Sequence, residues 1–145
     1  MRYIYFISDE DRYWIEVDND GIAVRQIILS DGLYHISALE DCLAEGKVVD
    51  EEIDGDVTDI SRADFEHVWE KTLEEYRPVW NSTKQRFKIN DFIMAELAFY
   101  YPQGKIFKID NILVNYIGNK NVNLHEKLRM KIIGYDDTNM WIVAQ

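Results

Sequence analysis

The stretch YWIEVDNDGIAVRQIIL, residues 13–29, decides the fold of the first half of the chain because it reads as a β-hairpin. Aromatic and β-branched residues fill both arms, as in strands. Asp20-Gly21 supplies the positive φ that a tight two-residue turn requires. The register that this turn predicts pairs Tyr13 with Ile28, Trp14 with Ile27, Ile15 with Gln26, Glu16 with Arg25, and Val17 with Val24. In this register most apolar residues face apolar residues and Glu16 faces Arg25, which favours it.

Two flanking segments extend the hairpin into a β-meander of about four strands. RYIYFIS, residues 2–8, has strand composition, and LYHIS, residues 33–37, follows a second turn at Asp31-Gly32. The segment EVDNDG is not expected to bind calcium, because the twelfth position counted from Glu16 holds Ile27 and both flanks are strands.

The segment SRADFEHVWEKTLEEYR, residues 61–77, predicts a helix over one face of the meander. Ser61 and Asp64 form a start that resembles a capping box. One apolar stripe follows helical spacing and comprises Phe65, Val68, Trp69, Leu73 and Tyr76. His67 lies off this stripe and is expected on the surface.

The second half predicts five β-strands in about 60 residues, the first long and bent, which is typical of an OB barrel. The expected strands span residues 87–102, 105–110, 112–117, 127–136 and 140–144. The sequence therefore predicts an α+β fold: an antiparallel β-meander covered by one helix in a domain of residues 1–80, followed by a small OB-like barrel of residues 86–145. We expect residues 77–86 to be a linker, with Trp80 packed between the two domains.

The formal net charge of −11 is unevenly distributed. Residues 1–85 hold 8 Lys/Arg and 21 Asp/Glu, whereas residues 86–145 hold 8 and 6. The most acidic run is DEEIDGDVTD, whose carboxylates are Asp50, Glu51, Glu52, Asp54, Asp56 and Asp59. This run is interpreted either as a solvated loop or as a docking surface for a basic partner protein.

Other features narrow the function classes. Cys42 is the only cysteine, so an intramolecular disulfide is excluded, and its acidic neighbours favour a structural role. No apolar run approaches the roughly 20 residues of a membrane span, and no signal peptide is recognisable, so we expect a cytoplasmic protein without membrane contact. No catalytic motif or metal-ligand spacing is present, and no enzyme activity, catalytic residue, metal or cofactor is expected.

Residues 10–75 resemble a family of small bacterial domains of unknown function. The resemblance rests on a D-x-DG hairpin followed by Arg25, and on an F-E-x-x-W helix that begins at Phe65. It implies a meander with one helix and brings no known activity. Small acidic proteins of this kind often accompany secreted toxins as immunity proteins.

Residues 87–145 resemble the S-one type of RNA-binding OB domain, through the strand order and the turn at Pro102-Gln103-Gly104. That family binds RNA through aromatic rings and a histidine, at positions that hold Gln103, Ile106 and Asn115 here. The candidate RNA-binding residues that remain are Tyr101, Lys105, Phe107, Lys108, Tyr116 and Arg129. For the rings of Phe107 and Tyr116, a place in the barrel core is the competing interpretation.

Two functional hypotheses follow. The first is a cytosolic immunity-type binding protein that neutralises a toxin through its acidic surface. The second is a single-stranded RNA-binding barrel with an acidic accessory domain, which would need a cationic groove lined by outward-facing rings. The sequence leaves the oligomeric state open.

Overall fold

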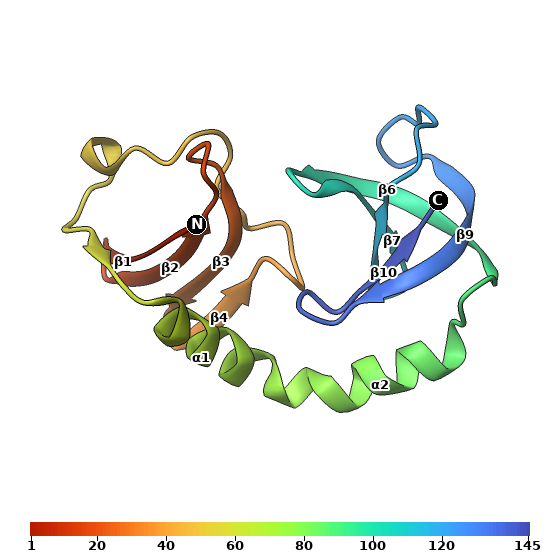
Figure 1. Cartoon of the computed structure of the whole chain (residues 1–145), viewed down its shortest axis with the longest axis horizontal. Coiled ribbons are helices and arrows are strands. Elements are labelled where there is room, and N and C mark those ends of the chain that lie inside the picture. Colours follow the sequence, from red (N-terminus) through yellow and green to blue (C-terminus); the bar gives the residue numbers. More distant parts are fainter. The chain divides into compact units, whose positions relative to one another are not determined.

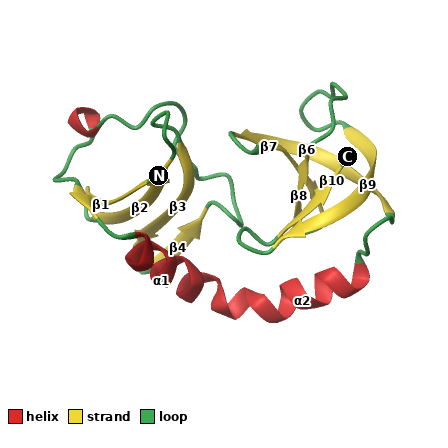
Figure 2. Cartoon of the chain, viewed as in Figure 1, coloured by secondary structure: helices red, strands yellow, loops and turns green.

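The structure is a computed structural model that describes residues 1–145, and the chain divides into two compact units, Met1–Glu75 and Tyr76–Gln145 (Figure 1). Each unit has a sheet of its own (Figure 2). The fold is α+β, with an antiparallel sheet and helix in unit 1 and a closed barrel in unit 2.

Unit 1 is built on a five-stranded antiparallel sheet in the order β4-β3-β2-β1-β5. The strands are β1 Arg2–Ser8, β2 Asp11–Val17, β3 Ala23–Ser30, β4 Leu33–Ile36 and β5 Thr58–Asp59. A short 3₁₀ turn, η1 Asp50–Glu52, precedes β5, and α1 Arg62–Leu73 follows it. The predicted meander with one covering helix is confirmed.

The register of the β2–β3 hairpin is confirmed except at its turn. Four predicted pairs are present, from Tyr13 with Ile28 to Glu16 with Arg25, but Val17 pairs with Ala23 because a bulge shifts the register. The carboxylate of Asp18 accepts the backbone N–H groups of Asp20 and Ile22, each at 2.9 Å. This side-chain turn adds a residue that simple alternation does not count.

Both faces of the unit 1 sheet are covered. Helix α1 buries Phe65, Trp69 and Leu73 against one face, and its first turn is capped as predicted, since the Ser61 hydroxyl accepts the Asp64 N–H at 3.0 Å. The loop after β4 covers the other face, where the buried Gln26 side chain accepts the Ala44 N–H at 2.9 Å. The sheet therefore has a helical layer on one side and an irregular layer on the other.

Unit 2 is a closed five-stranded barrel in the order β10-β8-β7-β6-β9. Its strands are β6 Phe92–Tyr101, β7 Gly104–Ile109, β8 Ile112–Tyr116, β9 Lys127–Asp136 and β10 Trp141–Ala144. Strand β6 pairs with β9 through its first half and with β7 through its second half, around a bulge near Leu97. Parallel pairing of β10 with β8 and antiparallel pairing with β9 close the barrel, which matches the predicted OB-like architecture.

The predicted linker is wrong, because residues 77–86 form helix α2, Arg77–Arg86, after the short turn η2 Glu74–Tyr76. Pro78 lies in the first turn of α2, where its missing N–H removes no helical hydrogen bond. Trp80 is buried within unit 2, where it packs edge-on to Tyr135 and donates to Asp137 at 2.8 Å. It belongs to the barrel unit and is not a linker side chain.

Candidate binding surfaces

The acidic loop of residues 50–59 is fixed to strand β1. The Arg2 guanidinium donates to both oxygens of Asp50, at 2.8 and 2.6 Å, and to Asp59 at 2.6 Å. The backbone of Gly55 lies so close to the Ile7 carbonyl that a Cβ at position 55 would clash with it. Hydrogen bonds from Arg2 also hold the pKa of Asp50 below its ordinary value. The loop is therefore anchored at both ends and at its middle.

The other four carboxylates of this loop are exposed and make no ion pair. They are Glu51, Glu52, Asp54 and Asp56. The structure thus brings all six predicted partner-binding residues together on one loop, with two paired with Arg2 and four facing solvent. An anchored row of unpaired carboxylates is suited to attracting cationic groups.

A hollow of about 200 Å³ lies beside the acidic loop. Its floor includes the stacked rings of Phe6 and Tyr13, whose centroids are 4.7 Å apart. Glu45 and Glu52 contribute carboxylates to its lining, together with Lys47. An apolar floor with carboxylates in the wall suits a basic side chain, since its aliphatic stem is buried while its charged end stays near the acids.

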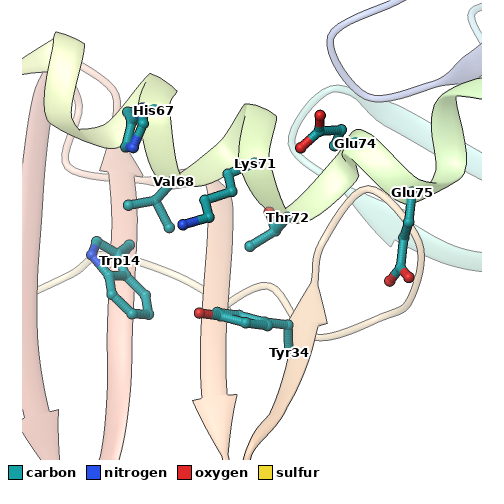
Figure 3. A pocket seen from close by; sticks show the side chains of 8 residues that line it. All are labelled: Trp14, Tyr34, His67, Val68, Lys71, Thr72, Glu74 and Glu75. Carbon is teal, nitrogen blue, oxygen red and sulfur yellow. The ribbon is translucent and has the colours of Figure 1, made fainter.

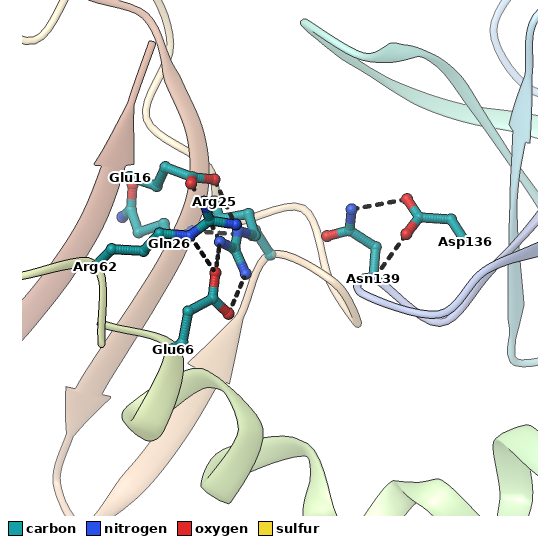
Figure 4. A network of polar contacts seen from close by, with 8 residues as sticks. Glu16, Arg25, Gln26, Arg62, Glu66, Asp136 and Asn139 are labelled. Carbon is teal, nitrogen blue, oxygen red and sulfur yellow. Dashed lines mark hydrogen bonds and ion pairs between the residues drawn. The ribbon is translucent and has the colours of Figure 1, made fainter. Parts of the chain in front are cut away.

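A buried ionic cluster lies between the sheet and α1 (Figure 4). Arg25 donates to Glu16 at 2.7 and 3.1 Å and also to Glu66 on α1. Its guanidinium lies 4.9 Å from the ring centroids of both Phe65 and Trp69. Arg25 and the F-E-x-x-W residues of α1 therefore meet in one cluster that joins the helix to the sheet.

The charges of this cluster are stabilised within the protein. Burial alone would raise the pKa of Glu16, but hydrogen bonds and charge from Arg25, with the Tyr3 hydroxyl, outweigh it and leave the pKa lowered. Burial opposes the charge of Arg25, yet its two carboxylate partners raise the pKa of the guanidinium. The cluster is paired on every side, which suits a structural role.

A larger groove of about 530 Å³ lies on the helix side of unit 1 (Figure 3). Trp14 and Tyr34 project from the sheet, and side chains of α1 face them across the groove. The lining residues are Trp14, Tyr34, His67, Val68, Lys71, Thr72, Glu74 and Glu75. His67 is exposed, as predicted, and the groove itself was not predicted from the sequence because it depends on how α1 crosses the strands.

In unit 2, the three rings considered for RNA stacking lie in the barrel core. For Phe107 and Tyr116 this is the core interpretation that the sequence analysis left open, whereas the expected outward position of Tyr101 is wrong. Tyr101, Phe107 and Tyr116 are 8%, 0% and 4% exposed. The Phe107 and Tyr116 rings pack edge to face with centroids 5.4 Å apart. A small barrel needs large side chains to fill its interior, and these rings fill it. Lys108 and Arg129 are exposed, while the Lys105 ammonium donates to the Lys120 carbonyl at 3.0 Å.

The outer face of β6 and β9 carries an exposed ring that the sequence analysis missed. Phe92 is 55% and Met94 is 52% exposed, and the Arg129 guanidinium lies 4.1 Å from the Phe92 ring centroid. The register places Lys131 opposite Phe92, and Lys127 opposite Glu96. None of these β9 cations makes an ion pair, whereas Lys84 on α2 is paired with Asp137 at 2.7 Å. The alternation of charge along residues 127–131 was a signal for this face.

Several smaller features bear on chemistry. Burial raises the pKa of the Cys42 thiol to about 12, helped by Glu40 and Asp41, so little thiolate forms at neutral pH.

Within the barrel unit, Asn139 donates to Asp136 through its backbone at 3.1 Å and through its side chain at 2.9 Å (Figure 4), which fixes the turn before β10. None of the helices combines the length and apolar character needed to cross a membrane.

Comparison of the chain with protein-family models and with curated proteins finds no match in either set.

Proposed function

We propose that this protein is a non-enzymatic binding protein of the immunity type, which neutralises a basic toxin domain in the cytoplasm through the acidic surface of unit 1. The observation that carries this proposal is the anchored acidic loop. Arg2 fixes its two ends and leaves Glu51, Glu52, Asp54 and Asp56 unpaired. A fixed loop loses little conformational entropy on binding, which favours affinity.

Charge and shape of unit 1 support the same proposal. Unit 1 holds 6 Lys/Arg and 21 Asp/Glu, so a basic partner is attracted over distances near the Debye length of about 10 Å. The hollow floored by Phe6 and Tyr13 offers a place for a lysine or arginine of the partner, next to Glu52 of the loop. Long-range attraction and a local pocket thus act at one surface.

The first test is genetic and biochemical. The function requires a gene for a basic secreted toxin beside the gene of this protein, and co-expression of the two products should relieve the toxicity. Binding of that toxin domain, measured by surface plasmon resonance, should weaken when salt is raised from about 50 to 200 mM. Affinity that does not respond to salt contradicts the proposed acidic surface.

A charge-reversal pair locates the surface. Asp54→Lys with Asp56→Lys should slow association by about tenfold or more, because both electrostatic steering and local attraction are reversed. The matched control is Asp20→Lys with Asp64→Lys, which changes the net charge equally at two exposed positions outside the acidic loop. Equal effects of the two pairs would mean that net charge matters and that the loop is not the docking site.

The outer face of β6 and β9 favours a second candidate function, single-stranded nucleic-acid binding by unit 2. Unit 2 holds 10 Lys/Arg and 6 Asp/Glu. Alternate residues of a strand lie roughly 6.6 Å apart, close to the spacing of neighbouring phosphates in an extended strand, so Lys127, Arg129 and Lys131 suit a phosphate backbone. The Phe92 ring beneath Arg129 offers a stacking surface for a base.

The nucleic-acid candidate is tested by fluorescence anisotropy of the whole chain with labelled single-stranded RNA and DNA at low salt. Phe92→Ala should lower the affinity by about tenfold, since one stacked base contributes roughly 1–3 kcal/mol. Tyr100→Ala is the control, because Tyr100 is 58% exposed on the same strand beyond the bulge. Absence of binding at low salt, or equal losses in both variants, excludes this face as the binding site.

A further inference from the structure

One edge of the unit 1 sheet is open. The edge beside β1 is occupied by β5, whereas β4 is the outermost strand at the other side and has only β3 as a neighbour. The side chains of Leu33 and Tyr34 on β4 are 66% and 51% exposed. An exposed sheet edge with unpaired backbone groups is a template for another strand.

The register identifies which backbone groups face outward. In an antiparallel pair, hydrogen-bonded and non-hydrogen-bonded residue pairs alternate. The two-residue turn at Asp31-Gly32 makes Ser30 and Leu33 a bonded pair, and the bond from the Ser37 N–H to the Gln26 carbonyl, at 3.0 Å, continues the same alternation. The N–H and C=O of Tyr34 and the N–H of Ile36 therefore point away from β3.

The groove of Figure 3 crosses the sheet beneath α1 and ends at this open edge. Tyr34 belongs to β4 and also lines the groove, opposite Val68 and Thr72 of α1. Trp14 forms the inner wall on the sheet side. A strand added beside β4 would direct alternate side chains to the helix side of the sheet, where they meet Tyr34 at the outer end of the groove. Tyr and Trp are also the residues that most often anchor protein interfaces.

We propose that β4 accepts an extended segment of a basic partner protein as a sixth strand, with apolar side chains of that segment packed against the exposed Tyr34 ring at the outer end of the groove. This inference rests on the proposed function only in that the partner is basic. The added strand would give the basic partner a second contact with unit 1, at the sheet edge opposite the acidic loop.

Charge favours a basic segment over a second copy of this chain. Glu74 and Glu75 lie in the wall of the groove, and Glu70 is exposed on the same helix. Asp31 is exposed at the turn that leads into β4. Lys71 and His67 are the basic side chains of the groove wall. With 21 Asp/Glu against 6 Lys/Arg in unit 1, a second copy is repelled while a cationic segment is attracted.

The test uses the whole chain and a synthetic eight-residue peptide of alternating lysine and valine. Binding is followed by amide NMR shifts and hydrogen exchange. The expected result is slower exchange at the Tyr34 amide, which lies on the exposed part of β4, with no binding of the matched glutamate-valine peptide. The Asp54→Lys, Asp56→Lys variant should still bind the peptide, so this result is separable from a failure of the acidic-loop proposal.

Two variants separate the contribution of backbone hydrogen bonds to peptide binding from the contribution of contacts in the groove. Tyr34→Pro should abolish peptide binding without unfolding the protein, because the N–H that is lost points away from β3 and proline is tolerated on edge strands. Tyr34→Ala keeps that N–H and should weaken binding by about tenfold through loss of the groove wall. Thermal unfolding of both variants verifies the fold.

Three outcomes overturn the inference. One is absence of peptide binding at low salt. Another is unchanged binding by Tyr34→Pro, or exchange protection at amides outside β4. The third is a concentration-dependent dimer of the chain that Tyr34→Pro disrupts, because it assigns the open edge to a second copy.

Discussion

The two units differ in how the edges of their sheets are paired. Unit 2 closes its five strands into a barrel, so every strand has two neighbours, and side chains such as Ile106, Phe107 and Val114 are fully buried inside. Unit 1 leaves its sheet open, caps one edge with β5 and holds α1 in place through the buried Arg25. The open sheet retains unpaired backbone groups at its edges, and its attachment to α1 includes a buried ion pair.

The largest effect is expected in the apolar core of the barrel. Phe107→Ala should lower the free energy of unfolding of unit 2 by about 4 kcal/mol, through lost burial and the cavity that remains. Urea unfolding followed by tryptophan fluorescence measures it. Phe92→Ala is the control, since that ring is 55% exposed and its loss should cost less than about 0.5 kcal/mol. Similar costs for both variants would contradict the assignment of core and surface.

Arg25→Ala should lower the free energy of unfolding of unit 1 by about 3 kcal/mol, because two carboxylates are left without their partner. The partial exposure of Glu66, 27% for its side chain, places the expected effect at the lower end for buried pairs. Arg25→Met combined with Glu16→Leu should recover most of the loss in the same urea titration, since no unpaired buried charge remains between the two strands. If Arg25→Ala lowers the free energy of unfolding by less than about 1 kcal/mol, the buried ion pair does not hold α1 to the sheet, and this contrast with the barrel of unit 2 does not stand.

Gly55→Ala tests how firmly the acidic loop is held. The residue has a φ of +148°, and a Cβ there would meet the Ile7 carbonyl, so the variant should lose about 2 kcal/mol. Gly134→Ala in the barrel is the control, because nothing lies within 4 Å of its Cβ position. Calorimetric melting of both variants gives the comparison, and an unchanged melting temperature in Gly55→Ala would mean that the loop is loosely attached.

The smallest effect is a pH dependence of unit 1. The folded protein lowers the pKa of Glu16, against the effect of burial, through Arg25, and lowers that of Asp50 through Arg2. A lowered folded pKa gives stability that is present above the unfolded value, about 4, and is lost as pH falls through the folded value. The melting temperature of unit 1 should therefore fall between about pH 5 and pH 3, with a shallower slope in Glu16→Gln; an unchanged slope contradicts this assignment.

Local patterns in the sequence predicted the elements well. The hairpin register from Tyr13 to Glu16 follows from alternation and the Asp-Gly turn, and the five barrel strands follow from apolar runs between turns. The failures arise where a side chain competes with the backbone pattern. Asp18 builds a bulge through two hydrogen bonds, and Pro78 lies in the first turn of a helix where a linker was predicted.

The candidate surfaces were less predictable because they depend on contacts distant in sequence. The acidic loop is visible as composition, but its anchoring by Arg2, some 50 residues earlier, is not. Tyr101 has the parity of the buried Ile93, Ala95 and Leu97, and the exposed Phe92 follows from where β6 begins, which the turn around Asn90 sets at residue 92. Alternation alone gives two faces to a strand and does not say which one is outside.

The parallel pairing of β8 with β10 has a consequence for biosynthesis. About 25 residues lie between these strands, and β10 is the last to leave the ribosome, so β8 and β9 keep open edges until Trp141–Ala144 has emerged. Closure of the barrel therefore waits for its last strand, and during that interval the earlier strands are candidates for chaperone capture or intermolecular pairing.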